Sequence, residues 1–185
     1  MTREEAPVSI AEQIQSIPTG AWTSDPKHSS VQFSVLHNGL TPFRGGFDAF
    51  EATLNDGRLV GIAKVESVTT EDENLTGHLL SPEFFDAERN PELRFESKEI
   101  RTEGNRVTID GDLTLKGVTK PVELRGELAG PISDAYGGTR LGLDLETTVD
   151  RTEFGIDWNA PLPSGENLLG NDVKLTAHVQ LVQEA

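Results

Sequence analysis

The sequence predicts an all-β fold whose antiparallel strands either close into a barrel or stack as two sheets. Two observations carry this prediction. After Trp22, apolar and polar residues alternate with a period of two, which is typical of strands with one buried face. Most of the links between them are short and rich in Gly, Asn and Asp. An antiparallel sheet with one apolar face must hide that face, and a barrel of about eight strands can hold one small ligand.

The alternation defines about eight strands in chain order. The clearest segments are residues 31–35, 107–115, 122–128, 141–149 and 173–181, and weaker ones are residues 43–54, 59–68 and 93–100. Asn55-Asp56-Gly57 and Glu103-Gly104-Asn105 have the composition of hairpin turns. Residues 131–138 predict a longer connection.

A short helix is expected before the first strand. Ser9 and Glu12 fit a capping box, and isoleucines follow at helical spacing up to Pro18 and Gly20. We therefore divide the chain into a helical arm, residues 1–20, and a β domain, residues 21–185. The apolar side of the arm is expected to pack on the β domain, with binding of a partner as the alternative.

The alternation stops between Val68 and Leu93. Thr70 and Glu73 fit a second capping box, and Ser81 followed by Pro82 fits the start of another helix. Two short helical turns are predicted here, and they are expected to lie across one end of the sheet. The adjacent Phe84 and Phe85 in this connection imply an apolar surface beneath it.

Composition narrows the possible partners and compartment. The formal net charge is −15 and the sequence pI is near 4.6, which argues against binding to nucleic acid or to an anionic membrane surface. The chain has no cysteine, which excludes disulfides and thiol chemistry. The sequence also shows no apolar run of signal-peptide or membrane-helix length, so we expect a cytoplasmic protein without membrane insertion.

Residues that could support catalysis are scarce. The four histidines lie in four separate segments, and neither a metal-binding spacing nor a nucleophile motif accompanies them. His37 falls on the same face of the expected strand as Val31, Phe33 and Val35, which is the face expected to be buried. It therefore fits a hydrogen-bonded core histidine, a polar contact for a ligand or, less well, a catalytic base.

The run from Val149 to Leu175 is unusual because prolines and glycines interrupt its alternation. Trp158 could line an opening here or end a strand against the core. Arg151, beside Asp150 and Glu153, fits a structural ion pair better than a ligand clamp.

Several motifs in fixed order resemble the YceI-like family of polyisoprenoid-binding, lipocalin-like proteins. These are WTSDPKHSSVQFSVLHNGLTPFRGGFDAF (residues 22–50), HLLSPEFFDAERNPELRFES (78–97), IDGDLTLKGVTKPVEL (109–124), VDRTEFGI (149–156) and GNDVKLTAHVQL (170–181). The resemblance covers nearly everything after Gly20.

The resemblance implies a lipocalin-like antiparallel barrel with an apolar channel for a long lipid. Family ligands include isoprenoid quinones, isoprenoid diphosphates and fatty amides, and some members form homodimers. The family has no known catalytic mechanism, so we expect a binding protein without cofactor or metal. Many relatives are exported, whereas this sequence shows no signal peptide.

The expected ligand-binding residues are chosen from the family resemblance and from the inward-facing positions of the alternating strands. His37 would meet a polar group, and Phe84 and Phe85 would close one end of the channel. The full set is Phe33, Val35, His37, Phe47, Leu79, Phe84, Phe85, Phe95, Leu113, Leu115, Phe154 and Trp158. A diphosphate head would need Arg44, Arg89 or Arg151, and the acidic surface suits a neutral or quinone head at least as well.

Two rival hypotheses remain. One is an enzyme acting on a small apolar substrate with His37 or His78 as base. The other is a non-enzymatic, stress-linked interaction module whose barrel is filled by its own side chains. Alternation of apolar residues is the same in a filled and in a hollow barrel.

Overall fold

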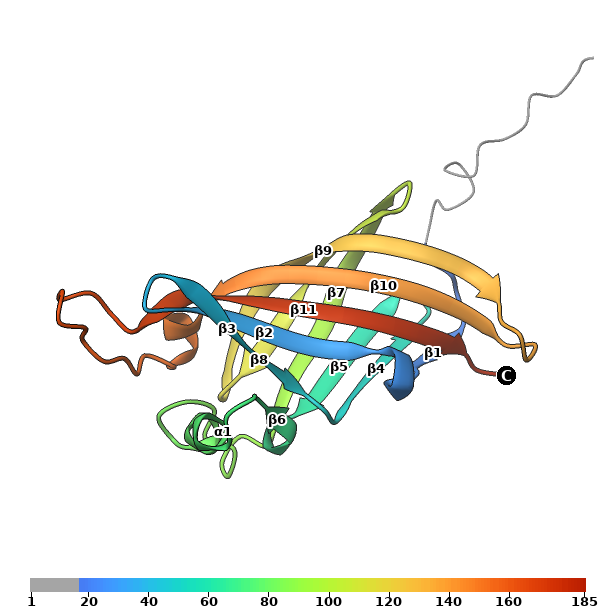
Figure 1. Cartoon of the computed structure of the whole chain (residues 1–185). Helices are drawn as coiled ribbons and strands as arrows, with labels where there is room; N and C mark the ends of the chain where they lie inside the picture. Colours follow the sequence, from blue (N-terminus) through green and yellow to red (C-terminus); the bar gives the residue numbers. More distant parts are fainter. Residues whose placement is uncertain (1–16) are drawn as a thin grey trace, which may run out of the picture.

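The computed structural model describes residues 17–185, which form one antiparallel sheet of 11 strands (Figure 1). The strands are β1 (Ala21–Ser24), β2 (Ser30–His37), β3 (Thr41–Phe47), β4 (Phe50–Asn55), β5 (Arg58–Lys64), β6 (Val68–Thr69), β7 (Glu92–Glu103), β8 (Arg106–Leu115), β9 (Val118–Ser133), β10 (Thr139–Asp150) and β11 (Leu169–Gln183). The helical elements are α1 (Glu73–Leu80) and the 3-10 turns Pro26–His28, Val65–Ser67 and Arg151–Phe154. The expected arm helix lies outside the described residues as far as Ser16.

The short strand β1 closes the sheet into a barrel. It pairs with β4 on one edge and with β11 on the other, so the order β1-β4-β5-β7-β8-β9-β10-β11 returns to its start. This ring has 8 strands, all paired antiparallel, which confirms the predicted barrel and excludes two stacked sheets.

Strand β11 is much longer than β1 and has a second partner on the same edge. Its residues 181–183 pair with β1, whereas residues 169–178 pair with β2. Strands β2, β3 and β6 therefore extend the wall beyond the closed ring. The segment expected as one strand from Phe43 to Leu54 breaks at Asp48 and Ala49. The reason is that β3 pairs with β2, whereas β4 pairs with β1 and β5.

Hairpin turns appear where the sequence predicts them. Asp56 and Gly57 have φ values of 48° and 83°, and Gly104 has a φ of 61°. Positive φ at such positions matches the right-handed twist of the flanking strands. The connection expected at residues 131–138 is shorter, because β9 continues to Ser133 and β10 begins at Thr139.

The connection between β6 and β7 contains one helix instead of two helical turns. Helix α1 begins after Asp72, whose carboxylate accepts a hydrogen bond from the Asn74 amide at 2.9 Å, and not after Thr70. The stretch after Ser81 is a series of turns, because Asp86 takes a φ of 50° that an α-helix does not allow. The Lys116 ammonium, in the β8–β9 turn, donates to the Pro82 carbonyl at 2.7 Å and holds this connection over the barrel.

The two ends of the barrel differ in their connections. The β4–β5, β7–β8 and β9–β10 hairpins lie at one end, called the hairpin end, with β1 (Figure 1). The β2–β3 hairpin, α1 and the long β10–β11 loop lie at the other, called the mouth end. Within residues 17–185 no helix has the length and hydrophobicity needed to cross a bilayer.

Candidate functional site

The barrel encloses an apolar cavity in two adjoining parts. The inner chamber has a volume of about 110 Å³ and the outer chamber about 50 Å³. Phe47, Leu93 and Leu175 line both chambers and form the boundary between them. All accessible surface in both chambers is apolar, so the cavity suits a hydrocarbon ligand.

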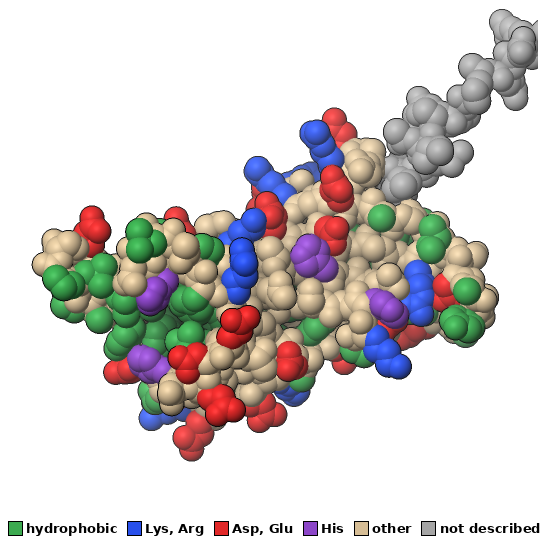
Figure 2. All heavy atoms as spheres, viewed as in Figure 1, with side chains coloured by type: hydrophobic (Ala, Val, Ile, Leu, Met, Phe, Trp, Pro, Cys, Tyr) green, Lys and Arg blue, Asp and Glu red, His purple; other side chains and the backbone are tan. Residues whose placement is uncertain are grey.

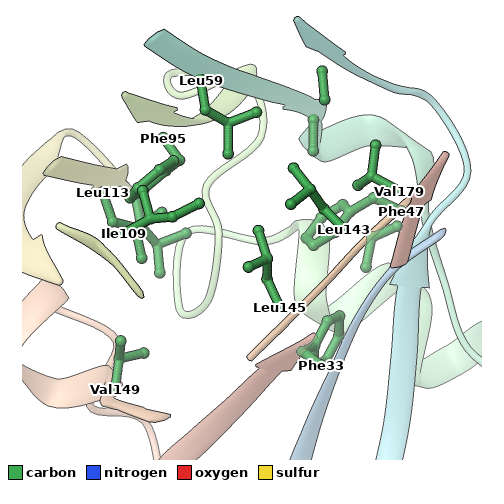
Figure 3. Close-up of a cluster of buried hydrophobic side chains, with 14 of the residues drawn as sticks. Phe33, Phe47, Leu59, Phe95, Ile109, Leu113, Leu143, Leu145, Val149 and Val179 are labelled. Atoms are coloured by element: carbon green, nitrogen blue, oxygen red, sulfur yellow. The ribbon is translucent and has the colours of Figure 1, made fainter. Parts of the chain in front are cut away.

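Small side chains on one wall create the inner chamber. Ala52, Gly61 and Ala63 occupy inward positions of the paired strands β4 and β5, and a Cβ atom added at Gly61 would meet no atom within 4 Å. Larger side chains line the other walls. Figure 3 shows Phe95 and Leu113 facing Leu143 and Val179 across the interior, with Leu145 between them.

The outer chamber is built around an aromatic cluster. The Phe33 ring packs on Phe43, Phe47 and Phe85, with centroid distances of 6.4, 5.7 and 6.0 Å. Phe85 also contacts Phe47 edge-on at 5.6 Å. Gly45 makes this packing possible, because a Cβ atom there would overlap the Phe33 ring. Such edge-to-face contacts hold rings in defined positions while leaving an apolar surface.

The outer chamber borders a wider surface pocket of about 350 Å³, called the mouth. Phe43, Phe84 and Leu169 line both spaces. In Figure 2, hydrophobic side chains and two histidines gather at this end of the molecule. The cavity therefore adjoins a surface pocket at the mouth end.

The mouth has a polar side made by two histidines. The His78 ring contacts Phe84 and Trp158 edge-on, both at 4.8 Å, and its Nε2 lies 2.6 Å from a Glu83 carboxylate oxygen. His37 ends β2 and lines the same pocket. These groups offer hydrogen bonds to a polar group at the entrance.

Arg151 is a charged residue in the lining of the outer chamber. Its side chain is 3% exposed. Nε donates to the Gly170 carbonyl at 2.8 Å, and Nη1 donates to the carbonyls of Ile156 and Trp158 at 2.9 and 2.8 Å. Burial lowers the pKa of this guanidinium, because its charge is removed from water.

The structure brings most of the predicted ligand-binding residues to this cavity. Ten line the chambers or the space next to them: Phe33, Val35, Phe47, Leu79, Phe84, Phe85, Phe95, Leu113, Leu115 and Trp158. His37 lies at the mouth. Phe154 is 1% exposed and packs in the core, outside the linings of both chambers.

The adjacent Phe84 and Phe85 face different partners. Phe84 contacts His78 and Trp158 beside the mouth, whereas Phe85 contacts Phe33 and Phe47 inside the barrel. Both line the outer chamber. The pair therefore covers the apolar end of the cavity.

Sequence reasoning missed part of the lining. Leu143, Leu145 and Val179 stand at inward positions of strands whose alternation is clear, so parity alone was enough to find them. Ala52, Gly61 and Ala63 give no comparable signal, because small residues occur equally at bulges, edges and turns.

Comparison with known proteins agrees with this architecture. The YceI-like domain model matches residues 22–181. A UPF0312 protein of Staphylococcus aureus (strain N315) is 33% identical over 167 residues, which is 86% of this chain and 95% of that protein. BcnA of Burkholderia cenocepacia has a TM-score of 0.70 at 18% identity, covering 85% of this chain and 98% of that one.

A second solved structure is a polyisoprenoid binding domain from Saccharophagus degradans. Its TM-score is 0.68 at 12% identity, covering 88% of this chain and 98% of that one. The fold and the site define a lipocalin-like barrel with an apolar internal cavity. The chain belongs to the YceI-like family.

Proposed function

We propose that this protein binds one long apolar lipid of isoprenoid type inside the barrel and sequesters or carries it. The observation that supports this most is a cavity with wholly apolar surface, which lies between fully buried side chains at the hairpin end and the surface pocket at the mouth. The fold neighbour described as a polyisoprenoid binding domain points to the same ligand class.

The energetics favour a chain-like ligand. Burial of each CH₂ group contributes about 0.8 kcal/mol, so a few isoprene units suffice for micromolar binding after the entropy costs of association. The chambers have volumes of about 110 and 50 Å³. An apolar cavity of roughly 150 Å³ holds a benzene-sized molecule. A longer chain therefore requires the rings of the outer chamber to rotate toward the mouth.

We propose a binding protein and not an enzyme. What supports this is the wholly apolar surface of the two chambers and the fold neighbour described as a polyisoprenoid binding domain. The proposed binding involves one copy of the chain. The homodimer and the cytoplasmic location stay predictions.

The test is organic extraction of protein purified without detergent, followed by mass spectrometry, and then uptake of an isoprenoid quinone by delipidated protein. A stoichiometric isoprenoid or long-chain amide is expected in the extract. An empty extract with no uptake would contradict the proposal and favour the interaction module with a filled barrel.

Gly61→Val sharpens this test. The new side chain enters the inner chamber at a position where its Cβ atom has no other atom within 4 Å. We expect quinone uptake to fall to a small fraction, while thermal stability stays equal or rises by up to about 1 kcal/mol, since glycine disfavours strands. Gly77→Ala, at an equally open position on α1, is the matched control. Full uptake by Gly61→Val would contradict the inner chamber as the ligand site.

A further inference from the structure

The guanidinium of Arg151 has more donors than partners. An arginine side chain carries five N–H donors. Nε and Nη1 make the three backbone hydrogen bonds of Arg151, but Nη2 is buried and has no partner within residues 17–185. A buried donor without an acceptor is destabilising and rare in folded proteins. The three existing bonds already hold the loop after β10, so this structural role leaves Nη2 unused.

The charge of Arg151 also lacks a close counterion in the described chain. Asp150 and Asp157 act on it electrostatically, without a hydrogen bond to the guanidinium. Arg101, on the outer face of β7, differs: it forms ion pairs with Glu99, Asp110 and Glu123. A buried cation is strongly disfavoured unless an anion accompanies it.

The position of Arg151 indicates where such an anion would come from. It lines the outer chamber together with apolar residues that include Phe33, Leu115 and Val149. The outer chamber lies between the mouth and the inner chamber. It shares the lining residues Phe47, Leu93 and Leu175 with the inner chamber. A head group held here would place the first carbons of its chain at the inner chamber, and the rest of a longer chain would need side chains of the lining to move.

We propose that Arg151 Nη2 binds a negatively charged oxygen in the head group of the lipid, as in a carboxylate or a phosphate ester. This inference rests on the proposed function and adds the class of head group and its position. Nη2 is shielded from water, so the oxygen reaches it only when apolar side chains of the outer chamber move apart. A longer chain requires the same movement.

The test compares matched anionic and neutral ligands on the delipidated full chain by calorimetric titration. One pair is farnesyl phosphate and farnesol, and the other is palmitate and methyl palmitate. The wild-type protein is expected to bind the anion of at least one pair about ten- to a hundredfold more tightly, as for a hydrogen bond to a charged group. The pair that shows this preference identifies the head group as phosphate or carboxylate.

Two variants connect the preference to Arg151. Arg151→Gln is expected to remove it, whereas Arg101→Gln, which changes the net charge equally at a surface ion-pair network, is expected to keep it. If Arg151→Gln does not fold, the comparison of anionic and neutral ligands on the wild-type protein still tests the head-group inference. Palmitate binding is then also expected to be lost as the pH falls through the pKa of its carboxylate. Equal binding of anions and neutral ligands would overturn the head-group inference alone. Failure of all four ligands to bind would overturn it together with the proposed function.

Discussion

The hairpin end and the mouth end of this barrel use the same alternating pattern for opposite purposes. At the hairpin end, Trp22, Leu54, Leu141 and Leu181 are at most 1% exposed and fill the interior. Toward the mouth, the small residues Ala52, Gly61 and Ala63 leave space in the interior, and this space is the inner chamber. The size of inward side chains, and not their hydrophobicity, determines whether the barrel is plugged or hollow.

The largest effect is expected from Trp22→Ala at the hairpin end. Trp22 is 1% exposed, and its indole nitrogen donates to the Thr19 carbonyl at 3.0 Å. The substitution is expected to lower the free energy of unfolding by about 3–5 kcal/mol, as measured by urea denaturation. Trp158→Ala, at the half-buried mouth, is the matched control and should cost clearly less. Equal losses would show that the two ends are not packed differently.

Adding an aromatic ring should have different effects at the two ends of the barrel. Leu141→Trp overfills a position that is 0% exposed and is expected to cost about 1–3 kcal/mol or more in denaturation. Leu113→Trp places the same ring beside the inner chamber, where we expect a smaller loss of stability together with loss of bound lipid. Phe84→Trp should act likewise at the outer chamber. Unchanged lipid stoichiometry in both channel variants would contradict this placement of the ligand.

The smallest effect concerns charges that stabilise the hairpin end from outside. Hydrogen bonds from His28 and Arg140 lower the pKa of Asp25, and Arg140 likewise lowers the pKa of Asp134. Because these pKa values are lower in the folded state, their stabilisation is present above the unfolded value of about 3.9. It is lost as the pH falls through the folded values.

Arg140→Gln should therefore lower stability at neutral pH, and the difference from the parent should shrink in acid. Thermal unfolding between neutral pH and pH 3 would measure this. Lys174→Gln is a suitable control, because its ion pair with Glu146 is more exposed. A difference that is constant with pH would show that Arg140 acts through packing and not through these carboxylates.

Much of the fold followed from local patterns, as β8 and β10 illustrate. Their alternation over residues 107–115 and 141–149 predicts strands within a residue or two of Arg106–Leu115 and Thr139–Asp150. The four-residue β1 and two-residue β6 are too short to show a period. The helix expected after Ser81 did not form, because Asp86 adopts a left-handed backbone conformation there.

The sequence by itself determined the all-β class, the family and an apolar interior, because period-two alternation and ordered motifs are local properties of the chain. Only the tertiary structure decided that β1 closes the ring. It also decided that the interior has a cavity next to Gly61 and is filled by side chains around Trp22. It also showed that Arg151 lines the outer chamber and that its Nη2 has no hydrogen-bond partner among residues 17–185. These features depend on which side chains face each other across the barrel, and strands far apart in sequence supply them.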